Sequence, residues 1–476
     1  MNILLTGANG YIAKRLLPAL LSHGHRVICC VRDANRINLP AAVAKMVEVI
    51  EVDFLNPDTL QVIPKDIDAA YFLIHSMTSS RNFKELEKQC AVNFKKVIEK
   101  TTCKQVIFLS GIVNENTLSD HLESRKNVET ELESKVYHLT TFRAGIIIGS
   151  GSASFEIMRD LVEKLPIMIA PKWLETRCQP IGIANVISIL EMSLLNKKTF
   201  DRNFDIGGPD ILTYKEMLLG YAKMRGIKRY IGVVPVMTPK LSSYWLYFIT
   251  STSYKLATAL VDSMKVEVVC RDNEINQIIG LNPFSYEVAL KRTMAVIEEN
   301  QIVSSWKDAF SSSNVDYKIS DFLEVPTYGC FIDKRSAIAE DQDVTFSKIW
   351  RIGGDTGWYF ADILWKIRGF IDKIWGGVGL RRGRTNPNQI SPGDAIDFWR
   401  VLYASKKEKR LLMFAEMKLP GDAWLEFKLL DGKLYQTATF RPKGIWGRVY
   451  WFALYPIHVV IFKGMCKKIA SNSTLL

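Results

Sequence analysis

The feature that most constrains this chain is a glycine-rich turn directly after its first apolar run. The run Ile3–Leu5 is followed by Thr6, Gly7 and Gly10, and then by the small residue Ala13. This pattern predicts a strand that ends at Thr6, a tight turn at Gly7 and a helix that begins close against the strand. The free backbone N–H groups at the start of such a helix point toward an anion. The turn therefore predicts a phosphate site, with the pyrophosphate of a dinucleotide as its natural ligand.

The residues after the turn complete a βαβ pattern. Residues 14–22 have a helical pattern, and Gly24 precedes a second strand at Arg26–Val31. Two glycines three apart are common in loops, so the alternative is an ordinary strand–turn–helix connection, but the βαβ context favours a dinucleotide site. Because the first strand starts beside Met1, we expect no signal or transit sequence.

Length and charge limit the possible classes of protein. The 476 residues exceed what one hydrophobic core normally holds, so we expect at least two domains. The net charge of +12 fits an anionic ligand or an anionic membrane. The basic clusters Arg381–Arg384 and Lys406–Arg410 are typical of solvated loops, so we expect no nucleic-acid partner.

The cysteines and histidines lack the spacing of a metal site. The eight cysteines include no CxxC and do not group with the six histidines, so we expect no metal and reduced thiols in a cytoplasmic protein. No stretch reaches the ~18 uninterrupted apolar residues of a membrane span. The closest stretches, Tyr244–Val261 and Trp446–Phe462, are interrupted by charged or polar residues. Peripheral membrane contact therefore stays open.

Apolar runs and helical patterns alternate through the first half of the chain. Strands are expected at Val47–Val52, Ala69–Ile74, Gln105–Leu109 and Leu139–Ile148, and helices at Phe83–Glu99 and Ser124–Leu132. Repeated alternation of this kind predicts an α/β fold with a doubly wound parallel Rossmann sheet. The ligand of such a sheet lies at the carboxyl ends of its strands.

The residues after the second strand bear on the choice between NAD and NADP. A dinucleotide enzyme places the group that meets the adenine ribose about 20 residues after the glycines. Arg32 occupies this place, and a guanidinium pairs with a 2′-phosphate that a carboxylate would repel. NADP(H) is therefore favoured, with Arg36 able to assist. Asp33 keeps NAD(H) possible, and a surface arginine after a strand is the alternative for Arg32.

Small polar residues follow the later strands, where the rest of a dinucleotide would pass. Asp53 could accept a hydrogen bond from the adenine amino group or could form an Asx turn. The strand ends at residues 74–76 and 110–111 fall where the nicotinamide ribose would lie. Residues 143–145 end the next strand with a close-approach glycine.

On these motifs the chain resembles the extended, atypical branch of the short-chain dehydrogenase/reductase superfamily, close to its NmrA-like and complex-I-associated members. The matching segments are Thr6–Ile12, Asp53-Phe54, Ile74–Ser76, Arg143–Ile146, Gln179–Ile181, Ala184–Val186 and Phe204–Pro209. The likeness covers roughly the first 300 residues. Members bind NAD(P)(H), and many are oxidoreductases. The resemblance and the strand ends together assign these residues to the cofactor: Gly7, Asn9, Gly10, Tyr11, Ile12, Arg32, Asp53, Phe54, Leu73, His75, Ser76, Ser110, Gly111, Arg125, Arg143 and Gly145.

The catalytic positions depart from the pattern of that superfamily. Its members use a tyrosine and a lysine four residues later, and the resemblance places His121 and Arg125 at these positions, with Glu129 aligned to the family's trailing glutamate. The serine expected near Ser110 is also missing. A histidine could act as acid or base near neutral pH, and Arg125 could hold a ribose or a phosphate. The alternative for His121 is a histidine on the helix surface.

Residues 151–300 lack the regular alternation of strand-like apolar runs and helical patterns that precedes them. In extended members such a segment caps the nicotinamide and forms the substrate pocket, with Trp173, Arg177 and Gln179 as candidate lining residues; a buried structural tryptophan is the alternative for Trp173. The aromatic stretch Pro235–Asp262 could be a lid or a membrane-facing patch. We therefore expect a Rossmann domain at 1–230, with cap elements from residue 151, and a helical cap at 231–310.

A change of composition at Ser311–Asn314 marks a linker to a further domain at 315–476. A tryptophan-rich helix is expected from Trp358 to Trp375, a hairpin turn at Asp431-Gly432, and one long helix at Gly444–Ala470. Strands are expected at Ile396–Leu402, Arg410–Lys418, Ala423–Leu430 and Lys433–Phe440. This α+β order resembles the helix-grip fold of START-like proteins, and its motifs resemble an uncharacterised domain that trails atypical reductases. In that fold a cavity between sheet and helix takes lipids, quinones or other small hydrophobic molecules, unless side chains fill it.

Two functions fit these observations. The first is an NADP(H)-dependent oxidoreductase acting on a hydrophobic carbonyl or quinone, with the C-terminal domain holding substrate or shaping access. The second is a non-catalytic regulator or assembly factor that senses NADP(H). The missing Tyr/Lys pair favours the second, and the cofactor edge fits both. The sequence leaves the oligomeric state open.

Overall fold

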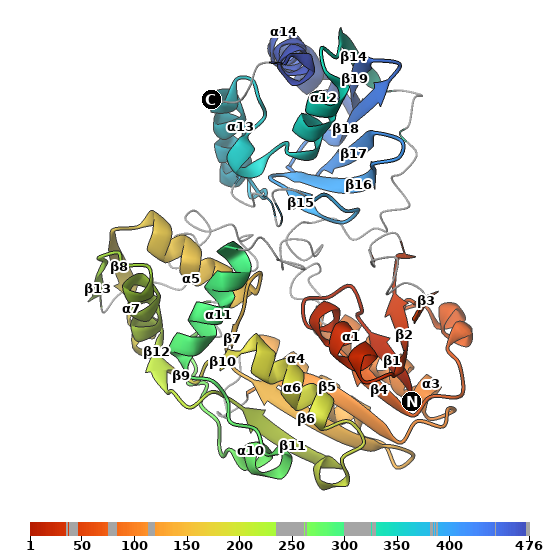
Figure 1. The fold of residues 1–476 in the computed structure, drawn as a ribbon, viewed down its shortest axis with the longest axis vertical. Coiled ribbons are helices and arrows are strands. Elements are labelled where there is room, and N and C mark those ends of the chain that lie inside the picture. Colours follow the sequence, from red (N-terminus) through yellow and green to blue (C-terminus); the bar gives the residue numbers. More distant parts are fainter. Residues whose placement is uncertain are drawn as a thin grey trace. The chain divides into compact units, whose positions relative to one another are not determined.

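The computed structural model describes residues 1–34, 37, 46–74, 83–112, 120–234, 261, 264–298, 325, 330–380, 384, 386, 389–442 and 444–472. These residues form two compact units, Met1–Trp306 and Lys307–Leu476 (Figure 1). Each unit has its own central sheet and its own hydrophobic core. The two units are described separately.

A seven-stranded parallel sheet forms the centre of the N-terminal unit (Figure 1). Its strands are β1 (Asn2–Thr6), β2 (Arg26–Val31), β3 (Val47–Glu51), β4 (Ala69–Phe72), β5 (Gln105–Gly111), β6 (His138–Ala144) and β11 (Arg202–Ile206). They lie in the order β3-β2-β1-β4-β5-β6-β11, which confirms the predicted parallel Rossmann-like sheet. The direction of winding reverses between β1 and β4, the point at which open sheets of this kind bind ligands.

Helices cover both faces of this sheet. The helices are α1 (Ala13–Ser22) and α6 (Ile183–Met192) on one face, and α3 (Phe83–Ile98) and α4 (Asp120–Leu132) on the other. Ile3 and Leu5 of β1 pack with Leu16 of α1, whereas Leu4 between them packs with Phe94 of α3. Successive strand residues point to opposite faces, so a strand covered on both sides is a continuous apolar run.

Smaller elements extend the N-terminal unit beyond the main sheet. Two-stranded pairs are formed by β7 (Ile147–Ile148) with β10 (Ile181–Gly182), β8 (Ile167–Pro171) with β13 (Tyr230–Val234), and β9 (Arg177–Cys178) with β12 (Leu212–Thr213). The accompanying helices are α5 (Ala153–Lys164), α7 (Tyr214–Met224), α10 (Glu274–Ile279) and α11 (Tyr286–Glu298). A separate apolar core joins Phe155, Tyr221 and Leu290 from three of these helices.

The strand predicted at residues 139–148 is two strands in the structure. β6 ends at Ala144, and at Gly145 the backbone passes so close to Val268 that a Cβ would lie 2.9 Å from the Cγ1 atom of that valine. The chain then forms β7 and pairs with β10 outside the main sheet. The prediction was wrong because both halves are apolar, and an apolar run does not show a change of partner.

The C-terminal unit contains a six-stranded antiparallel sheet. Its strands are β14 (Phe331–Ile338), β15 (Ala395–Ile396), β16 (Trp399–Ser405), β17 (Arg410–Ala415), β18 (Gly421–Leu430) and β19 (Lys433–Pro442), in the order β14-β19-β18-β17-β16-β15. The predicted turn at Asp431-Gly432 is confirmed: φ is 48° and 71°, as a two-residue type I′ turn requires. The strand predicted at Ile396–Leu402 is broken at Asp397, whose φ is 51°.

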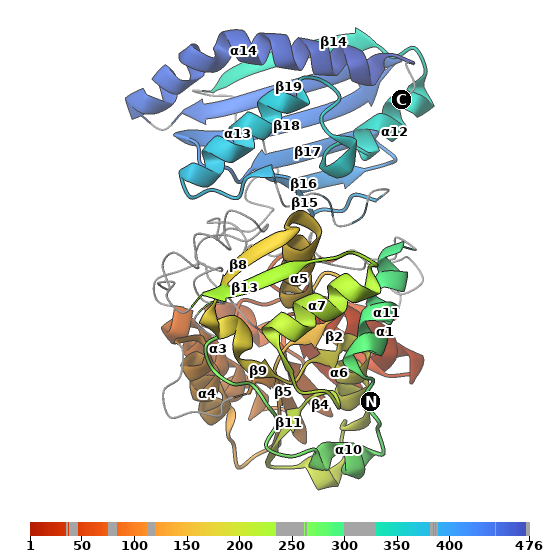
Figure 2. The same cartoon turned by 90° about the vertical axis from the view of Figure 1, so that its left-hand side faces the viewer.

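Helices α12 (Gln342–Trp350), α13 (Asp362–Ile374) and α14 (Gly444–Ala470) lie on one face of this sheet (Figure 2). α14 has the predicted bounds. The predicted tryptophan-rich helix begins only at Asp362, because Ala361 before it is left-handed with φ of 55°. Trp358 therefore precedes the helix, and its Nε1 donates to Asp397 Oδ2 at 3.0 Å.

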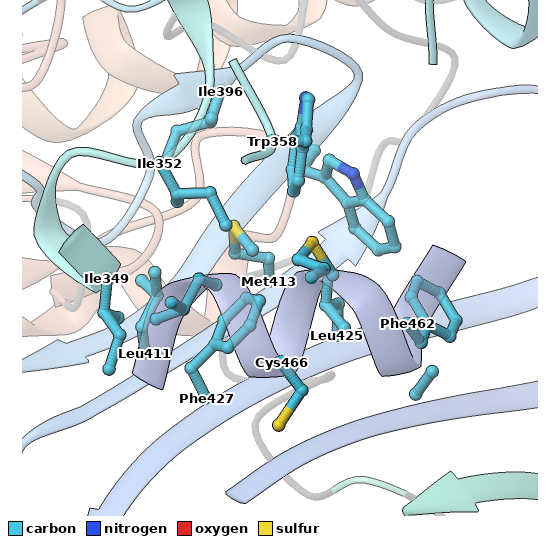
Figure 3. Close-up of a cluster of buried hydrophobic side chains, with 14 of the residues drawn as sticks. Ile349, Ile352, Trp358, Ile396, Leu411, Met413, Leu425, Phe427, Phe462 and Cys466 are labelled. Atoms are coloured by element: carbon cyan, nitrogen blue, oxygen red, sulfur yellow. The ribbon is translucent and has the colours of Figure 1, made fainter. Parts of the chain in front are cut away.

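The core of the C-terminal unit lies between the sheet and these helices (Figure 3). Met413 and Leu425 project from the sheet toward Ile349 of α12 and Phe462 of α14. Trp358 stacks nearby with its ring centroid 4.8 Å from that of Trp365.

All eight cysteines lie among the described residues, and no disulfide joins any of them. Burial raises the pKa of every one of these thiols. At Cys29, Cys90 and Cys178 it raises the pKa to about 12. Within the described ranges, no group of three or more His, Cys, Asp or Glu side chains could hold a metal ion.

Two arginine–glutamate pairs of equal sequence separation cross the C-terminal sheet in different environments. Arg400 Nε lies 2.8 Å from Glu416 Oε1, and the two side chains are 1% and 0% exposed. Arg410 Nε lies 2.6 Å from Glu426 Oε1, but these side chains are 31% and 24% exposed. Water can therefore screen the second pair and not the first.

We predict that Glu416→Gln lowers the free energy of unfolding of the C-terminal unit by about 3 to 5 kcal/mol, because it removes the negative charge that faces a buried guanidinium. The matched change Glu426→Gln should cost about 0 to 1 kcal/mol. Urea unfolding followed by tryptophan fluorescence measures both. Equal costs for the two variants would contradict the assignment of Arg400 and Glu416 as a buried ion pair.

Candidate functional site

The glycine-rich turn is held against the end of β4 by backbone contacts. Gly7 has φ of 62°, and a Cβ there would lie 2.8 Å from the carbonyl oxygen of Leu73. The Thr6 hydroxyl donates to the carbonyl oxygen of Tyr71 at 3.0 Å and accepts from the N–H of Leu73 at 3.1 Å. Glycine is therefore required at position 7 by the fold itself, at the point where the sheet changes its direction of winding.

The N-terminus of α1 is open to an anion. Its N-cap residue is Ile12, which supplies no capping side chain, and its first turn contains no acidic residue. The backbone N–H of Gly10 donates to Gly7, but those of Asn9, Tyr11 and Ile12 have no acceptor in the part of the chain that the structure describes. Unsatisfied N–H groups at a helix N-terminus, together with the helix dipole, form a phosphate site.

Tyr11 contributes to this turn through its backbone, since its side chain is used elsewhere. The guanidinium of Arg15 lies 3.9 Å from the centre of the tyrosine ring and donates to the carbonyl oxygens of Tyr11 and Ser150. A Cβ at Gly149 would lie 2.3 Å from the tyrosine hydroxyl, so glycine is needed there to admit the ring. Burial raises the pKa of Tyr11 to about 12, so the phenol stays protonated.

The two residues after β2 differ in exposure. Arg32 is exposed, whereas Asp33 is 1% exposed. A carboxylate at Asp33 is thus turned into the protein, and the guanidinium is the group available at the end of this strand. Arg36, the predicted assistant, lies outside the described residues.

The residues after β3 have local roles. Asp53 Oδ1 accepts from the N–H of Leu55 at 3.0 Å, which is the Asx turn considered as the alternative. Phe54 is 3% exposed and packs against Phe94 of α3, with ring centroids 5.7 Å apart. A contact of either residue with a cofactor stays a prediction.

The ends of β4 and β5 flank the turn on its other side. Leu73 is partly exposed, and His75 and Ser76 lie outside the described residues. Ser110 is 7% exposed at the end of β5, beside the partly exposed Gly111.

Helix α4 contains both predicted catalytic positions. The backbone of His121 lies in its first turn, and Arg125 follows one turn later, so the two share a face of the helix. The guanidinium of Arg125 lies 5.9 Å from the centre of the Phe108 ring. Burial lowers the pKa of Arg125, and the charge of Glu87 opposes this shift. Glu87 is itself buried and accepts from the Ser124 hydroxyl at 2.6 Å.

Arg143 forms an ion pair with Glu129. Its Nε and Nη2 donate to the two carboxylate oxygens of Glu129 on α4, at 3.1 and 2.8 Å. Its neighbours in the sheet register are Ser110 on β5 and Asp205 on β11. Asp205 is buried and pairs with Arg271 at 2.7 and 2.8 Å. The first pair joins β6 to α4, and the second joins β11 to the segment before α10. Cofactor contact by Arg143 stays a prediction.

The three predicted substrate residues have different surroundings. Trp173 is 8% exposed and packs edge-on against Tyr214. Arg177 is exposed and pairs with Glu267 at 2.8 Å. Gln179 is 4% exposed, and its Nε2 donates to the carbonyl oxygen of Gly208 at 2.7 Å.

Gly145 was predicted to lie close to the cofactor. In the structure its backbone lies close to the side chain of Val268 instead.

Comparisons with known proteins agree with this geometry. Residues 7–144 match a family model described as NAD(P)H-binding, and residues 330–465 match one described as a protein of unknown function (DUF2867). A search of curated proteins found no match.

Solved structures share the fold of the N-terminal unit. A nucleoside-diphosphate-sugar epimerase from Staphylococcus aureus is 16% identical with a TM-score of 0.50, covering 61% of this chain and 100% of its own. An epimerase from Methanothermobacter thermautotrophicus is 12% identical with a TM-score of 0.50, covering 63% of this chain and 93% of its own.

Fold and site together define the class of the N-terminal unit. Residues 7–144 match an NAD(P)H-binding family, and the unit has a parallel Rossmann-like sheet. The match extends from Gly7 of the turn to Ala144 at the end of β6. The phosphate site predicted from the turn falls within it.

We predict that Gly7→Ala lowers affinity for NADPH by roughly tenfold or more, because its Cβ would displace the turn from Leu73 and misdirect the N–H groups of α1. Gly24→Ala is the matched control, since Gly24 also has positive φ (72°) but no atom within 4 Å of the added Cβ. Both variants should lose about 1 kcal/mol of stability from the left-handed backbone alone. Calorimetric titration that found equal affinity in the two variants would contradict this account of the turn.

Proposed function

We propose that the protein is an NADP(H)-dependent oxidoreductase that acts on a hydrophobic carbonyl or quinone. The observation that carries this proposal is the open N-terminus of α1 at the switch point of the sheet, inside the segment that matches an NAD(P)H-binding family. The preference for NADP(H) rests on the exposed Arg32 beside the buried Asp33. An exposed guanidinium can pair with a 2′-phosphate, whereas a buried carboxylate is not available to a ribose hydroxyl.

Helix α4 supplies the groups for the reaction in this proposal. A bound NADPH would supply the hydride. Arg125 has no hydrogen-bond acceptor among the described residues, so its guanidinium is available to hold the nicotinamide ribose or a phosphate. His121, one turn earlier on the same face, would give the proton that the substrate oxygen needs after reduction.

The substrate side of the proposal rests on the cap and on the C-terminal unit. Trp173, Arg177 and Gln179 belong to the cap elements after residue 151. The C-terminal unit packs a long helix against an antiparallel sheet, with buried side chains between them. We extend the likeness to the helix-grip fold and assign this unit to holding a hydrophobic molecule or shaping its access. A cytoplasmic location fits the lack of disulfides among the eight cysteines. Peripheral membrane contact is a separate part of the proposal.

A second function is favoured by the absence of the Tyr/Lys pair. With histidine and arginine at those positions, the protein could bind NADP(H) without turnover and act as a sensing regulator or assembly factor. The involvement of Arg143 with Glu129 also leaves one fewer cation for a substrate.

Cofactor preference is tested by Arg32→Ala. This change should weaken NADPH binding by about 1 to 3 kcal/mol, from loss of a charge-assisted hydrogen bond, and leave NADH binding unchanged. Arg26→Ala is the control, because Arg26 begins the same strand at the opposite edge of the sheet and pairs with Glu48 at 2.7 Å. Tighter binding of NADH than NADPH by the unaltered protein would overturn the preference.

The role of His121 is tested by the rate of NADPH oxidation with a panel of quinones and enones. His121→Phe should slow oxidation by roughly a hundredfold or more, as expected for loss of a general acid. His138→Phe, at the amino end of β6, should leave the rate unchanged. Equal rates in His121→Phe and the parent would remove His121 from the mechanism. Binding of NADPH with no oxidation by the parent across the panel would favour the regulator.

A further inference from the structure

Helix α13 presents its apolar side to solvent. Ile363, Ile367, Phe370 and Ile374 recur at helical spacing and are all exposed, Phe370 by 58%. The inward side carries Trp365 and Asp372: Asp372 is 1% exposed and accepts from the backbone N–H groups of residues 379 and 418, at 2.8 and 2.7 Å. These bonds fix the rotation of the helix, so its apolar stripe is held outward.

The first half of α14 is exposed in the same way. Trp446 is 79% exposed, Phe452 is 65% exposed, and Val449 and Val460 are also exposed. By length and composition alone, Trp446–Ala470 could cross a membrane, with a mean hydropathy of 1.4 over a window that is 28% buried. Charged residues such as Arg448 interrupt this helix, so it contains no uninterrupted apolar run of the length of a membrane span. Its mean hydropathy is nevertheless high enough for one.

The two exposed stretches belong to one side of the C-terminal unit. α13 and α14 lie on the same face of the sheet in Figure 2. They are in contact through Trp365 and Phe462, whose ring centroids are 6.3 Å apart. We call the exposed apolar side chains of residues 363–375 and 446–460 the α13–α14 face. Soluble proteins rarely expose so many large apolar side chains together unless they bind a partner there.

Basic side chains predominate near the α13–α14 face, although α13 begins with the exposed Asp362. α14 contains Arg448, Lys463, Lys467 and Lys468 and no acidic residue. The aromatic residues Trp375 and Trp446, which are 73% and 79% exposed, belong to types enriched at the boundary between lipid and water. Apolar and aromatic side chains flanked by lysine and arginine are the composition of helices that lie in the plane of an anionic membrane.

We propose that the α13–α14 face docks on the surface of an anionic lipid bilayer. The second half of α14 cannot leave the protein to cross the bilayer, because Phe462, Met465 and Ile469 are buried in the core of the unit. The exposed residues therefore enter the lipid from the side, in the plane of the interface. A second copy of the chain fits less well, since a two-fold contact through this face would bring the same basic helix of each copy together.

The test is flotation of the full-length protein with lipid vesicles at about 150 mM salt. The protein should float with phosphatidylcholine vesicles that contain about one third phosphatidylserine, and much less with phosphatidylcholine alone. Phe370→Glu combined with Phe452→Glu should lower the partition coefficient by roughly tenfold or more, because it removes two aromatic side chains from the lipid and adds charges that lipid phosphates repel.

The matched control is Ile332→Glu combined with Ile338→Glu. Both isoleucines are exposed on β14 and alternate with inward residues such as Asp333, so they point away from the helices. This variant should float like the parent. Unchanged circular dichroism and NADPH affinity would show that both double variants are folded.

Tryptophan emission gives an independent readout. Trp375 and Trp446 are exposed, so anionic vesicles should shift the emission to shorter wavelength, and replacing both by phenylalanine should abolish the shift while flotation persists. Absence of flotation with anionic vesicles, or equal flotation of the two glutamate variants, overturns the proposal. A dimer in light scattering that Phe370→Glu with Phe452→Glu dissociates, without vesicle binding by the parent, would assign the face to a second copy.

Discussion

The contact of the Gly7 backbone with Leu73 is the constraint on which the N-terminal unit depends. It joins the first strand to its neighbour across the switch point of the sheet, and the Thr6 hydroxyl bonds both sides of this junction. Because α1 begins only a few residues later, its position is set by the same junction. The N–H groups at the start of α1 are therefore aimed by the sheet, and the phosphate site needs no side chain to form it.

The fold could be predicted from sequence where local pattern and tertiary environment agree. The strands β1, β2 and β4 are buried on both faces and are nearly continuous apolar runs, and the turn at Asp431-Gly432 follows from the backbone freedom of its residues. The break after Ala144 was missed because Val268, which crowds the chain there, is distant in sequence. β14 was missed because charged residues such as Asp333 interrupt its apolar pattern, and only pairing with β19 makes it a strand.

In the candidate site too, features set by local sequence could be predicted, whereas contacts with residues distant in sequence could not. Glycine positions in the turn are predictable because backbone geometry is local. The partner of Arg143 is not: its sequence position at a strand end suggests a cofactor contact, whereas Glu129 on the adjacent helix is the group that it meets. The buried Glu87 beside Arg125 and the pair of Asp205 with Arg271 gave no signal of their own, since a charged residue in a sequence is by default assigned to the surface.

The burial of the cysteines has a consequence for the chemistry proposed. Quinones and enones are Michael acceptors, and protein thiolates are the nucleophiles that they most readily alkylate. Since burial raises the pKa of all eight thiols, almost none is ionised at neutral pH. The six cysteines that are buried would therefore resist alkylation by electrophiles of this class in the folded chain, and would lose that protection on unfolding.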